Sequence, residues 1–183
     1  MTTGWLTSMN ALDPEAARAE LVTCCTTRRW ADELIAGRPY ADPAALRSAS
    51  AAALALQDWA GIEEALAAHP RIGDRVRGDE REAAWSRDEQ SGVDGAADDL
   101  RDALTAGNRA YEERFGHVFL ICATGLGAAE MLAALRDRLR NDVWRERMIV
   151  RRELAKIVDL RLGRLIDGER SDGGPGDGEG GPA

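Results

Sequence analysis

Residues 143–166 read VWRERMIVRRELAKIVDLRLGRLI, and this stretch decides the fold class. Its apolar residues recur at helical spacing and form one stripe, made of Val143, Val150, Leu154, Ile157 and Leu165. Leu160, Ile149 and Ile166 lie off the stripe, so the helix is expected to bury a second side as well. The stretch therefore predicts a long, largely buried helix that ends near Ile166.

Upstream, the chain continues to read as helices. Asp13-Pro14 and Asp42-Pro43 each pair a favoured N-cap residue with proline at the first helical position. Gly37, followed by Pro39, ends the helix between them. A short Thr124–Gly127 segment leads into another helix, and Asn141-Asp142 breaks the chain before the last one. Aromatic residues are only 5% of the chain, which also favours helices over a β-sandwich.

The middle of the chain predicts two further helices. Ala55, Trp59, Ile62 and Leu66 are spaced by 4, 3 and 4, so they predict one helix that stops near His69, because Pro70 disfavours a helical residue before it. Residues 71–84 are polar and contain two glycines, which predicts a loop. Ser86 is then expected to open a helix that runs towards Tyr111.

Length and composition predict one all-α helical bundle with a tail. At 183 residues the chain fits one domain, expected over residues 1–167. Residues 168–183 (GERSDGGPGDGEGGPA) are rich in Gly, Pro and Asp and predict a flexible, disordered tail. The net charge of −8 argues against binding to nucleic acid or to anionic membranes.

The cysteines and the N-terminal residues of the sequence indicate the cellular compartment. The start lacks a basic n-region and an apolar h-region, so no signal peptide is expected. Cys24, Cys25 and Cys122 cannot all pair, and two of them are adjacent. We therefore expect a cytoplasmic protein with reduced thiols.

His69 is the first polar residue on an apolar face. It continues the Trp59–Leu66 stripe by three residues, at a helix C-terminus, which favours the protonated imidazolium. Such a group suits an acid or base that works near neutral pH. The alternative is a core histidine bonded to a carbonyl, which from position alone is the commoner case.

Ser86, Glu89 and Gln90 are the second such place. On a helical wheel they extend the inward face that Val93, Leu100 and other apolar residues begin. Ser86-x-x-Glu89 is also the pattern of a capping box. The sequence therefore supports a structural role of these residues and a role in a functional site about equally.

Arg161 is the third place and the sharpest anomaly, because it lies in the middle of the apolar stripe of the last helix. A guanidinium keeps its proton, so a buried one needs an anion. That anion is either a protein carboxylate, the commoner case, or a carboxylate of a substrate.

Metal chemistry is not expected. The chain has only two histidines, His69 and His117, and lacks Cys-x-x-Cys, so it predicts no zinc site. His117 and Cys122 lie in an apolar segment and fit core packing better than ligation or nucleophilic attack.

In combination, these residues resemble a known family. His69-Pro70-Arg71-Ile72-Gly73, then Ser86-x-x-Glu89-Gln90, then residues 115–123 (FGHVFLICA), are similar to the motifs of the OHCU decarboxylases. Those enzymes act on 2-oxo-4-hydroxy-4-carboxy-5-ureidoimidazoline (OHCU) in urate degradation. Cys24-Cys25 with Arg29-Trp30, and Lys156-Ile157 with Arg161-Leu162, also resemble family motifs. The similarity spans Leu12 to Leu165, and the joint order of the motifs makes it specific.

The resemblance implies a cofactor-free, all-α, usually dimeric carboxy-lyase that yields (S)-allantoin and CO2 from a small ureidoimidazoline substrate. It implies His69 as the catalytic acid or base and Glu89 as its carboxylate partner. The residues implied in substrate binding are Pro70, Ser86, Arg87, Asp88, Gln90, Phe119, Leu120, Ile121, Cys122, Ala123 and Arg161, with backbone groups acting in the 119–123 segment. Two other interpretations stay open. One is a non-catalytic helical scaffold, and the other is a lyase or hydrolase for another ureido or hydantoin compound.

Overall fold

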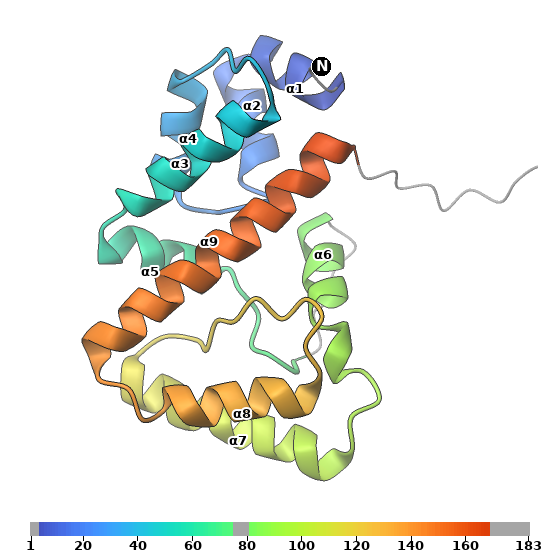
Figure 1. The fold of residues 1–183 in the computed structure, drawn as a ribbon, viewed down its shortest axis with the longest axis vertical. Helices are drawn as coiled ribbons and strands as arrows, with labels where there is room; N and C mark the ends of the chain where they lie inside the picture. Colours follow the sequence, from blue (N-terminus) through green and yellow to red (C-terminus); the bar gives the residue numbers. More distant parts are fainter. Residues whose placement is uncertain (1–3, 75–80, 169–183) are drawn as a thin grey trace, which may run out of the picture.

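The last helix, α9 (Val143–Asp167), runs diagonally through the molecule, and the other elements pack against its two ends (Figure 1). The structure is a computed structural model that describes residues 4–74 and 81–168. In those ranges it is all-α, as the sequence predicts. Residues 169–183, most of the expected tail, lie outside the described ranges.

Five helices pack along α9, and their contacts reach its N-terminal half, where the Arg147 guanidinium lies over the Trp59 ring. They are α1 (Gly4–Ala11), α2 (Pro14–Leu21), α3 (Arg28–Ala36), α4 (Pro43–Ala55) and α5 (Trp59–Ala67). The predicted N-caps are confirmed, since the Asp13 and Asp42 carboxylates accept backbone N–H bonds at the starts of α2 and α4. Trp30 and Leu154, both 0% exposed, belong to the apolar core that these helices share with α9.

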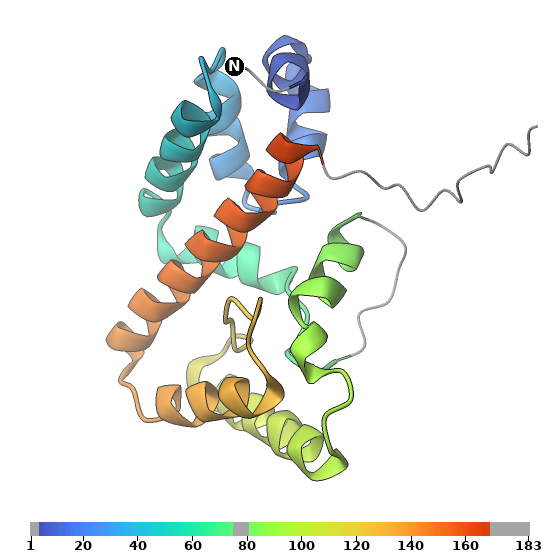
Figure 2. The same cartoon turned by 45° about the vertical axis from the view of Figure 1, so that its right-hand side comes forward.

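The remaining elements are α6 (Arg81–Glu89), a 3-10 turn at Ser91–Val93, α7 (Asp98–Phe115) and α8 (Ala128–Arg138). Of these, α7 and α8 run below α9 and α6 stands beside it, clearest after the 45° turn of Figure 2. Tyr111 and Met131, both fully buried, lie in a separate apolar cluster between α7 and α8. The molecule thus has two apolar clusters.

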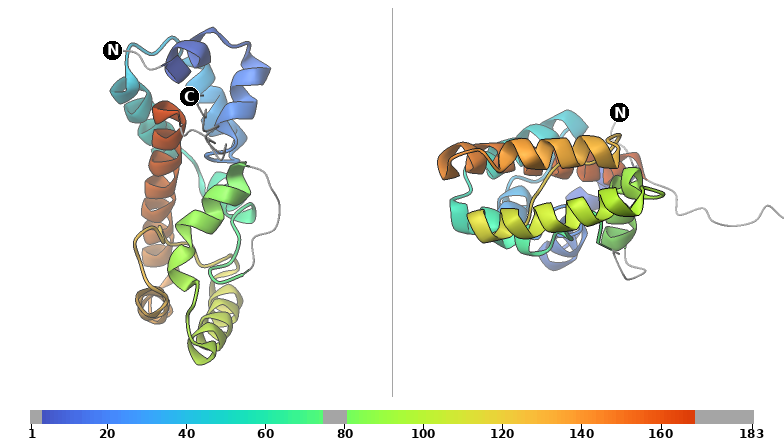
Figure 3. Two further views of the ribbon diagram at one scale, coloured as in Figure 1. Left: turned by 90° about the vertical axis from the view of Figure 1, so that its right-hand side faces the viewer. Right: turned by 90° about the horizontal axis from the view of Figure 1, so that it is seen from below.

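α7 and α8 lie side by side and point in the same direction (Figures 1 and 3). Two neighbouring helices with this orientation cannot be joined by a tight turn. Residues 116–127, here called the return segment, therefore run back along the helices. Their path is extended, because only an extended chain lets so few residues cover the length of a helix. Gly116, at φ 78°, makes the left-handed turn out of α7.

The prediction of one helix through Ala55, Trp59, Ile62 and Leu66 is wrong. α4 ends at Ala55 and α5 begins at Trp59. The carboxylate of Asp58 accepts a hydrogen bond from the Gly61 N–H at 2.9 Å, so it caps a new helix instead of continuing the old one. Of the four residues, only Ile62 and Leu66 are buried, whereas Trp59 is half-buried and Ala55 is exposed, so the regular spacing did not mark one inward face.

The prediction that Ser86 opens a helix running to Tyr111 is also wrong. α6 begins at Arg81, inside the predicted loop, and it ends at Glu89. Ser86 and Glu89 are therefore not a capping box. The 3-10 turn between α6 and α7 requires glycine at position 92, because a Cβ there would lie 1.8 Å from the Leu126 carbonyl oxygen. Gly95 follows in the left-handed region at φ 75°, where the chain turns towards α7.

The stripe on α9 is confirmed with one exception. Val150, Leu154, Ile157 and Leu165 are buried, whereas Val143, in the first turn, is 51% exposed. Of the three residues expected on a second side, Ile166 is buried and Ile149 and Leu160 are half-buried. Val158 and Leu162, for which the sequence made no prediction, are 0% exposed, so the helix is buried beyond the stripe. None of the helices in the described part of the chain is long and apolar enough to cross a membrane.

Candidate active site

A pocket opens at the boundary between the two apolar clusters, beneath the middle of α9. It encloses about 410 Å³, counted with the solvent space at its mouth. Its walls come from the turn after α5, the end of α6, the return segment and α9. The lining residues are His69, Pro70, Ile72, Ser86, Glu89, Gln90, Phe119, Leu120, Ile121, Cys122, Ala123, Thr124, Ile157, Leu160 and Arg161.

His69 lies just past α5, with its N–H bonded to the Leu66 carbonyl at 3.0 Å. Its Nδ1 lies 2.9 Å from the Ala65 carbonyl oxygen. Because a carbonyl oxygen only accepts, Nδ1 carries the proton and Nε2 holds a lone pair. Nε2 is buried, and no described residue hydrogen-bonds it. The structure therefore presents an unpaired proton acceptor at the pocket.

The expected preference of His69 for the imidazolium form is reversed. Burial, with repulsion from the Arg161 guanidinium, lowers the pKa of His69 from 6.5 to about 4. The Ala65 carbonyl and the Glu89 carboxylate act in the opposite direction but do not offset this. Loss of hydration lowers the pKa of His69 more than its position at the C-terminal end of α5 raises it, so His69 is neutral near pH 7.

Arg161 is 2% exposed and is paired with Glu89. Its Nε donates to Oε1 and its Nη2 to Oε2, both at 2.9 Å, which is the two-pronged geometry of a strong charged pair. Nη2 also donates to the Ser86 hydroxyl at 3.1 Å. Of the two partners that the sequence left open for Arg161, the structure has the protein carboxylate of Glu89.

A second arginine of α9 extends this cluster towards the surface. Arg164 bonds the Asp88 carboxylate at 2.5 Å and lies 3.9 Å from Oε1 of Glu89. Arg87 and Asp88 are exposed and do not line the pocket. The other residues that the sequence assigned to the site all line it.

Gln90 has a structural contact in the site. Its Oε1 accepts the Gly73 N–H at 3.1 Å, and the buried Asn108 of α7 donates to the Ile72 carbonyl at 2.8 Å. These two bonds hold the chain that follows His69 and Pro70. Glu89, which the resemblance pairs with His69, bonds Arg161 in this structure.

Sequence reasoning missed four lining residues, which are Ile72, Thr124, Ile157 and Leu160. Ile157 and Leu160 lie one turn and one residue before Arg161 on the same helix, so helical spacing from Arg161 is the signal that points to them. It also missed a buried network of Arg138, Glu146 and Tyr111, in which Arg138 Nε donates to Glu146 at 2.7 Å.

Other reactive side chains are few in this region. The three cysteines are free, and Cys24 and Cys25 are buried away from solvent. Burial raises the pKa of the Cys122 thiol, and the nearby Glu153 adds to this, which disfavours the thiolate that a nucleophile needs. Across residues 4–74 and 81–168, no group of three or more His, Cys, Asp or Glu side chains is arranged to hold a metal.

The neutral state of His69 predicts a pH dependence of stability. With a pKa of about 4 in the folded state and 6.5 when unfolded, His69 binds more protons in the unfolded chain between these values. Its contribution to stability is thus present above pH 6.5 and is lost as pH falls to 4, by up to about 3 kcal/mol. We expect His69→Asn to lose less stability than the wild type over this window in urea unfolding at a series of pH values. Parallel curves for the two proteins would show that His69 titrates normally.

Comparisons with known proteins agree on one family. The family model for OHCU decarboxylase matches residues 10–163. The chain is 33% identical over 132 residues to a 2-oxo-4-hydroxy-4-carboxy-5-ureidoimidazoline decarboxylase of Amia calva, a match that covers 71% of this chain and 75% of that protein. It is 30% identical over 159 residues to the uric acid degradation bifunctional protein TTL of Arabidopsis thaliana, covering 83% of this chain. The match spans about half, 48%, of the length of the Arabidopsis protein.

Solved structures share the fold. A crystal structure of an OHCU decarboxylase in the presence of (S)-allantoin superimposes with a TM-score of 0.68 at 27% identity, covering 79% of this chain and 94% of that one. A crystal structure of an (S)-allantoin synthase gives a TM-score of 0.66 at 18% identity, covering 88% of this chain and 54% of that one, and this similarity concerns the fold alone.

Proposed function

Because this chain belongs to the OHCU decarboxylase family, we propose that it removes CO2 from OHCU and yields (S)-allantoin without a cofactor. The observation that carries the proposal is the buried Nε2 of a neutral His69, which no described residue hydrogen-bonds, in the same pocket as Arg161 and Glu89. A base, an anchor for anionic oxygens and a carboxylate are the groups that this reaction requires.

The substrate supplies its own electron sink. Its carboxylate is attached to a ring carbon that also bears a hydroxyl and lies beside the conjugated C=N of the ring. When the carbon–carbon bond to CO2 breaks, its electron pair forms a ring C=C bond, and the C=N nitrogen takes up a proton from water. The enzyme then needs to orient the carboxylate and direct the later proton transfers.

Arg161 is the proposed anchor for an anionic or carbonyl oxygen of the substrate. Its two-pronged pair with Glu89 supports this role, because it demonstrates that a carboxylate fits against the guanidinium. A substrate oxygen would then compete with Glu89 for Arg161, and a displaced Glu89 would be free to approach His69, the pairing that the resemblance implies.

His69 is proposed to accept a proton first and to donate it second. Nε2 takes the proton of the ring hydroxyl as that carbon becomes a carbonyl, and the resulting imidazolium supplies a proton to the neighbouring ring carbon. Protonation on one face of that carbon gives one enantiomer of allantoin. The lowered pKa of His69 supports this order, because a neutral imidazole can only accept at Nε2.

The experiment that tests the function adds the purified protein to hydroxyisourate and its hydrolase, which produce OHCU in place. Circular dichroism follows the optically active product. We expect (S)-allantoin to appear faster than by spontaneous decay. If the rate equals the spontaneous rate, the decarboxylase assignment is wrong, and the scaffold interpretation gains support.

Turnover is expected to survive exhaustive chelation and to need no added organic cofactor, because the departing electrons delocalise into the substrate itself. The assay is repeated after dialysis of the wild type against EDTA, and the control is wild type dialysed against the same buffer without EDTA. A loss of turnover that zinc or manganese restores would contradict this prediction.

We further propose that the protein functions as a homodimer in the cytoplasm and that residues 1–167 form the catalytic domain. The resemblance supports the dimer, and the three free cysteines are compatible with a reducing compartment. Analytical ultracentrifugation at micromolar concentration measures the oligomeric state directly.

A further inference from the structure

The return segment forms one wall of the pocket, and its position depends on side chains from other elements. Residues 118–123 have neither helix nor turn, and the backbone hydrogen bond within the segment, from the Leu126 N–H to the Ala123 carbonyl at 2.9 Å, holds only its end. Phe119–Ala123 line the same pocket as Arg161 of α9. The contacts that hold this wall therefore set the shape of the site.

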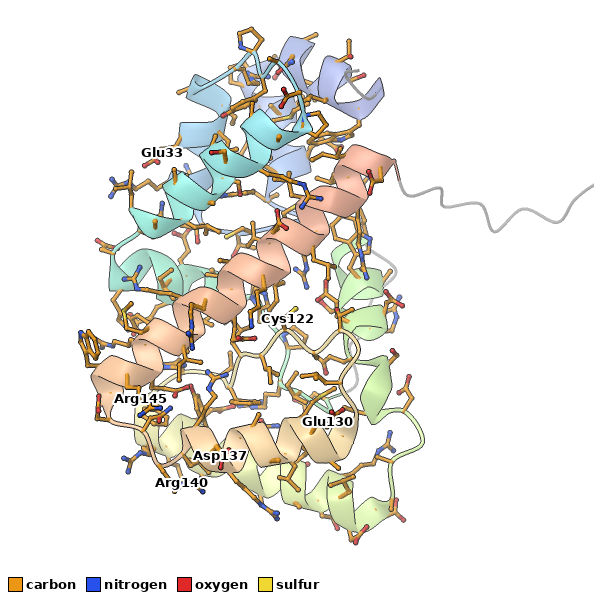
Figure 4. All side chains as sticks on the ribbon, viewed as in Figure 1. Glu33, Cys122, Glu130, Asp137, Arg140 and Arg145 are labelled. Atoms are coloured by element: carbon orange, nitrogen blue, oxygen red, sulfur yellow. The ribbon has the colours of Figure 1, made fainter. Side chains whose placement is uncertain are left out.

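Two charged side chains bond the backbone of the wall. Arg138 of α8 donates from Nη1 to the Leu120 carbonyl at 2.5 Å, and Glu146, 0% exposed, holds Arg138 in turn. Glu153 of α9 accepts the Cys122 N–H at 2.9 Å. Figure 4 labels Cys122 where the return segment passes α9. Arg138 and Glu146 are deep in the packing, whereas Glu153 is beside the pocket.

Glu153 is well suited to hold the wall in register with Arg161. It lies on α9 one turn before the pocket residue Ile157 and two turns before Arg161, so one rigid helix carries both the contact to the wall and the proposed anchor. It is 9% exposed, and its other oxygen accepts a bond from Lys156 Nζ at 2.6 Å. A buried carboxylate with both oxygens bonded has a defined orientation.

We propose that Glu153 is a positioning residue for the decarboxylation, acting through the Cys122 backbone to hold Phe119–Ala123 at the right distance from Arg161. The inference rests on the proposed function. Glu153 does not line the pocket, so it is not expected to touch the substrate. An apolar side chain at this position would leave the Cys122 N–H without its acceptor and the wall without its contact to α9.

Three variants separate the hydrogen bond from the charge. Glu153→Ala removes both, and Glu153→Gln keeps a carbonyl oxygen that can accept the Cys122 N–H. Lys156→Met is the matched control, since it removes the ion pair and leaves the bond to Cys122. We expect kcat/KM to fall about ten- to a hundredfold in Glu153→Ala, the scale for a misplaced wall, and to stay within about threefold in the other two.

Hydrogen exchange measured by mass spectrometry gives a readout that does not depend on activity. Peptides covering residues 118–124 are expected to exchange about tenfold faster in Glu153→Ala, with wild-type rates in Glu153→Gln and Lys156→Met. Melting curves establish that each variant is folded. Should Glu153→Ala fail to fold, Glu153→Met takes its place, because it keeps the length of the side chain but offers no oxygen to accept the Cys122 N–H.

Several results would overturn the proposal. Normal kcat/KM in Glu153→Ala, despite fast exchange, would mean that the wall position does not matter. An equal loss of activity in Glu153→Gln would assign the effect to charge. If the wild type itself fails to decarboxylate OHCU, the proposed function falls, and unchanged exchange in Glu153→Ala would separately reject the contact to Cys122.

Discussion

His69→Asn is expected to reduce turnover of OHCU by at least about two orders of magnitude, the usual scale for loss of a general acid or base. Nε2 of His69 is the buried acceptor in the pocket that lacks a partner among the described residues. Asparagine offers no imidazole to carry the proton from the ring hydroxyl to the neighbouring carbon. The circular dichroism assay, run under single-turnover conditions, measures the loss.

His117→Asn is the matched control, because His117 is the other histidine of the chain. Its ring packs edge-on against Trp59 and Tyr111 and bonds the Val118 carbonyl, and it does not line the pocket. We expect its turnover to stay near that of the wild type. A near-normal kcat in His69→Asn, with the fold intact, would show that His69 is a core histidine and nothing more.

Arg161→Leu is expected to lower both stability and catalysis. It leaves the Glu89 carboxylate, buried to 8% exposure, without its guanidinium, which costs about 3–5 kcal/mol. It also removes the proposed anchor for the substrate oxygen, so kcat/KM falls steeply. Urea unfolding and steady-state kinetics on the same preparation measure the two effects.

Two companion variants separate the effects. Arg161→Lys keeps a positive charge beside Glu89, so it is expected to retain most of the stability, yet a point charge cannot reproduce the two-pronged contact and kcat/KM still falls. Arg161→Leu with Glu89→Leu removes both charges and is expected to regain stability without activity. Normal turnover in folded Arg161→Leu or in Arg161→Lys would contradict a role of Arg161 in substrate binding. Its pair with Glu89 would then be purely structural.

Local patterns in the sequence indicated most of the helices and three parts of the site, at His69, at Ser86, Glu89 and Gln90, and at Arg161, whereas the resemblance implied the 119–123 segment. Proline after Asp13 and Asp42 marked two helix starts, and the stripe on residues 143–166 marked the long helix. The prediction from sequence was wrong where the same local pattern is compatible with two different structures. Asp58 caps a new helix in the middle of an apolar spacing, and Ser86 bonds Arg161 instead of opening a helix.

The amino-acid sequence by itself determined the all-α class, the starts of α2, α4 and α9 and the residues that interrupt apolar faces, because caps and helical periodicity act over a few neighbouring positions. Only the tertiary structure decided the protonation of His69, the partner of Arg161 and the contact of Glu153 with Cys122. A pKa depends on burial and on charges distant in sequence, here 92 positions apart for His69 and Arg161. Likewise, a charged side chain finds its partner only when packing brings α6, α9 and the return segment together.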